Sequence, residues 1–115
     1  MSDMDSDIIA RRELRSEGRT YEIRIERPRP VGAVGDYVCT WSLVDDTGAV
    51  LVSNDMHGVD AVQALVFAIA IIGDRIDGEL SAPTWLGFPG NGMPRHVDVR
   101  NQPGIISIFS SGYHL

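Results

Sequence analysis

Alternation of apolar and polar residues predicts strands in the first half of the chain. Residues 20–26 alternate without a fault, with Tyr21, Ile23 and Ile25 on one face and charged residues between them. This period of two is typical of a strand with one buried face. A less regular form of the same pattern predicts three further strands, at residues 8–14, 37–44 and 49–53. Turn residues between the strands favour a four-stranded antiparallel meander in the order of the sequence.

Two connections between these strands have clear turn chemistry. The sequence Asp-Asp-Thr-Gly at residues 45–48 predicts a hairpin turn, in which the aspartates form local hydrogen bonds with the backbone. Pro28 and Pro30 end the second strand, because proline has no amide hydrogen to donate to a sheet. Residues 31–36, with two glycines, are expected to form a long loop.

One long helix is predicted at residues 60–77. Asp60 is suited to accept a hydrogen bond from a free amide of the first turn, and Gln63 is placed to reach back toward the cap. At 100° per residue, one apolar stripe is expected to pack on the sheet; it contains Val62, Leu65, Val66, Ile69, Ile72 and Ile76. Gly78 is placed to end the helix in a left-handed conformation.

The opposite side of this helix also carries large apolar residues. Phe67 and Ile71 point away from the stripe, and side chains of this size need a cover. The C-terminal segment 104–109 could fold back over them as an arm or edge strand, or a second copy of the chain could bind there. Both alternatives stay open, and we expect a homodimer that associates through Phe67 and Ile71.

These elements predict a single α+β domain over residues 1–115. It consists of the four-stranded antiparallel meander, one long helix packed on one face, and a C-terminal arm or edge strand. Residues 1–7 are expected to be a disordered or loosely held leader. A chain of 115 residues is long enough for one domain with an apolar core.

Charge and composition exclude several classes of partner. Ten Lys and Arg residues against 16 Asp and Glu give a net charge of -6, which repels the phosphate backbone of nucleic acids. All basic residues are arginine, which is typical of a GC-rich bacterial genome. The acidic start is unlike a signal peptide, and the longest apolar run, 64–72, is too short for a membrane span. We therefore expect a cytoplasmic protein that binds neither membranes nor nucleic acids.

Candidate chemistry for catalysis is sparse. The three histidines are scattered without the spacing of a metal site, and the glycines between residues 87 and 92 lack the lysine of a phosphate loop. Cys39 lies in the middle of a predicted strand, where a thiol behaves as a small apolar side chain with a raised pKa. We expect no enzyme activity, no metal and no cofactor.

The irregular stretch at residues 81–96 offers the best candidate binding site. It contains Trp85, Phe88, Arg95 and His96, and tryptophan and arginine dominate the energetics of many protein interfaces. Alternatively, Trp85 and Phe88 only fill the seam between helix and sheet. A cavity framed by these two rings would favour a bound ligand.

These residues support a non-enzymatic protein-interaction or binding protein of unknown function. One alternative is a small-ligand binder or small enzyme with an anion site near Arg95 and His96. Another is an acidic immunity-type antagonist of a basic toxin, since net negative charge speeds the encounter with a positive surface.

Two sequence segments resemble a known family. The sequence Gly-Val-Asp-Ala-Val-Gln-Ala-Leu at residues 58–65, followed by Thr-Trp-Leu-Gly at 84–87 and Gly-Met-Pro at 92–94, is similar to a family of short uncharacterised bacterial proteins. The resemblance implies a small α+β domain with no assigned activity.

Overall fold

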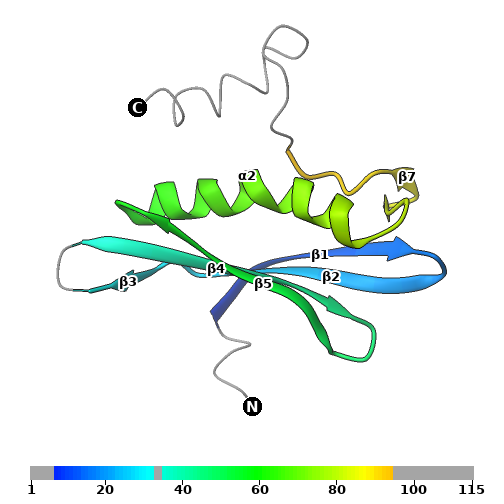
Figure 1. Cartoon of the computed structure of the whole chain (residues 1–115), viewed down its shortest axis with the longest axis horizontal. Helices are drawn as coiled ribbons and strands as arrows, with labels where there is room; N and C mark the ends of the chain where they lie inside the picture. Colours follow the sequence, from blue (N-terminus) through cyan, green and yellow to red (C-terminus); the bar gives the residue numbers. More distant parts are fainter. Residues whose placement is uncertain (1–6, 33–34, 95–115) are drawn as a thin grey trace, which may run out of the picture.

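The structure is a computed structural model that describes residues 7–32 and 35–94. Its elements are β1 (Ile8–Ser16), β2 (Arg19–Glu26), β3 (Arg29–Val31), β4 (Asp36–Asp45), β5 (Val50–Gly58), α2 (Ala61–Glu79), β6 (Thr84–Trp85) and β7 (Phe88–Pro89). Figure 1 shows α2 running along one face of the sheet, with β7 beside the C-terminal end of the helix.

All seven strands found in residues 7–32 and 35–94 belong to one antiparallel sheet. The order across it is β7, β6, β1, β2, β4 and β5, and β3 also pairs with β4. Because β5 already pairs with Tyr37 and Val38 of β4, β3 must use the opposite edge of that strand, which β2 occupies further along. β3 therefore follows β2 along the same edge of β4.

The predicted four-stranded meander with one long helix is wrong, because the sheet has seven strands and dominates the fold. The additional strands β3, β6 and β7 have three, two and two residues. Such short segments hold no alternation that a pattern can detect. The expected loop at residues 31–36 is also wrong at its ends, since Val31 pairs with Asp36. The C-terminal arm and residues 1–6 of the leader lie outside the described residues.

The start of α2 follows from its capping residues. The carboxylate of Asp60 accepts a hydrogen bond from the Gln63 amide at 2.8 Å, and the Gln63 side chain accepts one from the Val59 amide at 2.8 Å. The predicted cap is confirmed. The predicted end is wrong, because the helix continues past Gly78 to Glu79, and Leu80 caps it with a negative φ.

The buried face of α2 agrees with the predicted stripe at Ile72 and Ile76 and differs from it at other positions. Ala64, Ala68, Ile72 and Ile76 are fully buried, whereas Val62 is 69% exposed. The helix is apolar on nearly all sides, so its periodicity does not select one face, and the small alanines let it lie close to the sheet.

Within the described residues, no helix has the length and hydropathy needed to cross a membrane.

Candidate functional site

Arg12 is a charged side chain on the inward face of β1. The register places Arg12 opposite Ile23, in line with Ala10 and Leu14, which face Ile25 and Tyr21. An arginine therefore stands in the row of residues that turn toward α2. It is only half-buried. This partial burial lowers the pKa of Arg12 from its ordinary value, because desolvation disfavours the charged form.

The guanidinium of Arg12 connects β1 to the segment after the helix. Its central carbon lies 3.9 Å from the centroid of the Trp85 ring. Its Nη1 donates to the Asn91 carbonyl and to the sulfur of Met93, each at 3.4 Å. In the part of the chain that the structure describes, no carboxylate forms an ion pair with Arg12. The positive charge is thus held by a ring face, a carbonyl and a thioether.

Asn91 fastens the same segment to α2. Its side chain is fully buried and donates to the Gly73 carbonyl at 3.0 Å and to the Asp77 carboxylate at 3.1 Å. Its amide oxygen accepts a hydrogen bond from the Met93 backbone at 2.9 Å. Two hydrogen bonds thus hold Asn91 on α2, and a third fixes the backbone of Met93 relative to it.

Residues 85–88, here called the hairpin tip, form a two-residue turn between β6 and β7. Trp85 pairs with Phe88, and both central residues have a positive φ, 53° at Leu86 and 82° at Gly87. That conformation suits a tight β-hairpin. Leu86 is 76% exposed and Phe88 is 68% exposed. The tip therefore presents two large apolar side chains to solvent.

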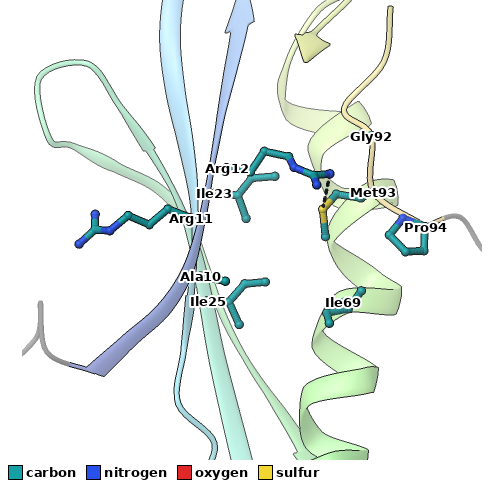
Figure 2. Close-up of a pocket in the computed structure, with 9 residues that line it drawn as sticks. All are labelled: Ala10, Arg11, Arg12, Ile23, Ile25, Ile69, Gly92, Met93 and Pro94. Carbon is teal, nitrogen blue, oxygen red and sulfur yellow. Dashed lines mark hydrogen bonds between the residues drawn. The ribbon is translucent and has the colours of Figure 1, made fainter. Parts of the chain in front are cut away.

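A cavity of about 390 Å³, here called the Arg12 pocket, lies between the sheet, α2 and the segment that follows the hairpin. Its walls are formed by Ala10, Arg11, Arg12, Ile23, Ile25, Ile69, Gly92, Met93 and Pro94. Figure 2 shows the Arg12 side chain reaching across toward Met93, while the Arg11 side chain points to the other side of the sheet. A second hollow of about 390 Å³ flanks the hairpin tip and is lined by Arg11, Arg12, Glu13, Arg15 and residues 84–87.

The structure separates the predicted binding residues. Trp85 packs against the core cluster and lies over Arg12, whereas Phe88 is exposed and does not fill the seam between helix and sheet. Arg95 and His96 lie outside the described residues, so the anion site predicted there stays a prediction. Phe67 and Ile71, predicted for self-association, are partly buried, and Ile71 packs against the core cluster.

Two residues of this site, Arg12 and Asn91, were missed by the sequence analysis. A signal for Arg12 is present, because the strand at residues 8–14 has an imperfect period of two, and the charge occupies the inward position between Ala10 and Leu14. Asn91 has no such signal. Its place between two glycines is typical of an exposed turn.

Nucleophilic and metal chemistry find little support in the described residues. Cys39 is fully buried, and burial raises the pKa of its thiol to about 11, which keeps it protonated and unreactive at neutral pH. Throughout residues 7–32 and 35–94, no three histidine, cysteine, aspartate or glutamate side chains gather in a group that could hold a metal ion.

The site lies within a recognised sequence family. Residues 10–94 match the model of a domain of unknown function, DUF6968. The chain belongs to the DUF6968 family. The expected membership of an uncharacterised family is thereby confirmed, and the function of DUF6968 is unknown. No curated protein and no solved structure shows significant similarity to the chain. The DUF6968 match includes Arg12, the hairpin tip and Asn91, so the whole candidate site belongs to the family domain.

Proposed function

We propose that this DUF6968 domain is a non-enzymatic interaction protein that binds an acidic segment of another protein on its hairpin tip. The observation that carries the proposal is the exposure of Leu86 and Phe88 on a folded turn. Burying a side chain of this size against a partner contributes about 1.5 to 3 kcal/mol. Such exposed apolar pairs on a fixed scaffold are typical of binding surfaces.

Backbone conformation at the tip supports the same function. Leu86 has a φ of 53°, a left-handed conformation that costs a residue with a Cβ atom about 1 to 2 kcal/mol. Within the described chain this strain is not offset by burial of the leucine, which is 76% exposed. The folded domain thus holds Leu86 outward at a cost in stability, which is consistent with a role in contact with a partner.

Charge beside the tip indicates the chemistry of the partner. Three arginines, Arg11, Arg12 and Arg15, and one carboxylate, Glu13, line the hollow that adjoins it. Arg11 is paired with Glu22 on the outer face. Arg12 and Arg15 therefore supply the positive charge next to the two exposed apolar side chains, in a chain of net charge -6. A peptide with carboxylates on either side of an apolar residue would complement this surface.

Selection from a random-peptide library on the folded protein tests the proposal. We expect enriched peptides to combine Asp or Glu with an apolar residue. A synthetic peptide of that sequence should bind at least about tenfold more weakly to the double variant Leu86→Ser and Phe88→Ser, and more weakly at high salt. The matched control is Val50→Ser and Leu51→Ser, which removes exposed apolar residues from β5 at the other edge of the sheet. Enrichment of basic peptides, or equal loss of binding in the control, would refute the proposal.

Other inferences rest on the sequence alone. A homodimer through Phe67 and Ile71 is a second proposal, motivated by a helix that is apolar on nearly all sides. A basic toxin as partner is supported only by the net charge of -6. We further infer a bacterial source from the exclusive use of arginine among basic residues.

A further inference from the structure

The Arg12 pocket combines apolar walls with a single inward charge. Side chains from the sheet, from α2 and from the segment after the hairpin form those walls: Ala10, Ile23, Ile25, Ile69, Met93 and Pro94. A volume of about 390 Å³ lies within the range of small-molecule sites, which span roughly 300 to 1,000 Å³. Of the two arginines that line the pocket, Figure 2 shows only Arg12 directed toward the helix side of the sheet.

The guanidinium of Arg12 has donors to spare. An arginine has five N–H groups in a planar fork, and both contacts of Arg12 to Asn91 and Met93 use Nη1 alone at 3.4 Å. Neither Nε nor Nη2 has a protein acceptor among the residues that the structure describes. A partly desolvated cation without a carboxylate is costly, so an anion at this position lowers the free energy of the folded state.

The chemistry of the pocket selects one class of anion. The planar fork of arginine matches the two oxygens of a carboxylate. The net charge of -6 repels a polyphosphate more strongly than a ligand with a single negative charge. The isoleucines and Met93 suit a hydrocarbon body, because they offer no hydrogen bond to a sugar or a nucleobase.

We infer that the Arg12 pocket binds a small monocarboxylate with an aliphatic body, its carboxylate on the Arg12 fork and its chain between Ile23, Ile69 and Met93. This site shares Arg12 with the hollow beside the hairpin tip, but Leu86 and Phe88 are not among the residues that line it. A variant that blocks the pocket and leaves Arg12 in place therefore tests ligand binding separately from peptide binding at the tip.

Arg12 also connects β1 to Trp85, and a purely structural role as a clamp makes different predictions from a ligand site. A clamp predicts that its removal lowers stability and that no carboxylate affects the protein. A ligand site predicts in addition that carboxylate and neutral analogues of the same chain length differ in affinity, and that this difference depends on Arg12.

Calorimetric titration of the full chain with octanoate, octanol and acetate separates these roles. We expect octanoate to bind at least about tenfold more tightly than either analogue, since a charge-assisted pair and a buried alkyl chain each contribute more than about 1.4 kcal/mol. In Arg12→Gln the affinity for octanoate should fall to that for octanol, while the affinity for octanol stays the same. Amide shifts in an NMR titration should include Ile69 and Met93.

Two further variants keep the test independent of the Trp85 contact. Ile69→Trp fills the cavity without altering Arg12 and should abolish binding of octanoate. Arg24→Gln is the matched control, because Arg24 lies on β2 opposite Arg11, on the outer face, and pairs with Glu22. It should leave the affinity for octanoate unchanged within about twofold. No binding of octanoate to the wild type, equal binding of octanol, or equal losses in Arg12→Gln and Arg24→Gln would overturn the inference.

Discussion

Asn91 shows at the scale of one residue how a segment without regular secondary structure becomes fixed. The side chain is fully buried, and each of its polar atoms has a partner on α2 or on the backbone of Met93. Because the same segment forms one wall of the Arg12 pocket, this amide sets the distance between that wall and the helix. Asn91 does not line the pocket itself, but it fixes the position of one of its walls.

We predict that Asn91→Ala lowers the free energy of unfolding by about 2 kcal/mol, because the Gly73 carbonyl, the Asp77 carboxylate and the Met93 amide lose a buried partner. Asn91→Asp should lower the free energy of unfolding further near neutral pH, because a second carboxylate then lies beside Asp77 and the two negative charges repel each other. Burial and repulsion raise the pKa of the new carboxyl in the folded state. In the folded state this carboxyl therefore stays protonated up to a higher pH than in the unfolded state. The free energy of unfolding of Asn91→Asp rises as the pH falls, because protonation removes the buried charge.

Urea denaturation at about pH 7 and about pH 5 measures both effects. The difference in stability between Asn91→Asp and Asn91→Ala should shrink at the lower pH. If this difference is the same at both pH values, the amide of Asn91 does not lie beside Asp77 in the folded protein.

At the scale of elements, length decides what a sequence pattern can reveal. The four longer strands lie where alternation predicts them, and Asp60 with Gln63 predicts the start of α2. The short strands β3 and β6 escape prediction because they form through pairing with β4 and β1, which is a tertiary contact, and β7 pairs in turn with β6. The residues of the candidate site also differ in how far the sequence indicates them. Residue type indicates Trp85 and Phe88, strand register could have indicated Arg12, and only the folded chain brings Asn91 against α2.

Close packing of α2 on β5 depends on one glycine. A Cβ atom added at Gly58 would collide with the backbone nitrogen of Ala64 in the first turns of the helix. We predict that Gly58→Ala lowers the free energy of unfolding by about 1 to 3 kcal/mol, because the helix must move away from the sheet. Chemical denaturation followed by circular dichroism measures this loss.

Gly78→Ala is the matched control for Gly58→Ala. Gly78 lies inside α2, and a Cβ atom there would meet nothing within 4 Å. Alanine should therefore stabilise the protein by about 0.5 to 1 kcal/mol, through its higher helix propensity. If both variants change stability by the same amount, contact between Gly58 and the helix does not limit their approach.

At the scale of the whole molecule, the sheet has α2 on one face and a charged surface on the other. On that outer face Glu22 of β2 forms ion pairs with Arg11 of β1 and with Arg24 of its own strand. These pairs offset the like charges that the register sets opposite each other, Arg11 with Arg24 and Glu13 with Glu22. Exposed pairs of this kind contribute little to stability, and they keep the open face of the sheet hydrated. Of these two faces, the apolar helix is therefore the one through which we predict self-association.

We predict that the protein forms a homodimer through the side of α2 that carries Phe67 and Ile71. Phe67→Gln should shift the equilibrium toward monomer, because it removes the larger of the two apolar side chains from the contact. Ile71 also packs against the core cluster, so its substitution would confound stability with association. Sedimentation equilibrium from about 5 to about 200 μM measures the dimer fraction.

Phe88→Gln, which alters an exposed ring on the hairpin tip, is the control and should dimerise like the wild type. A wild type that stays monomeric over the whole range would exclude this dimer. Dissociation by Phe88→Gln but not by Phe67→Gln would move the contact between copies to the hairpin tip, where a second chain would then compete with the acidic partner.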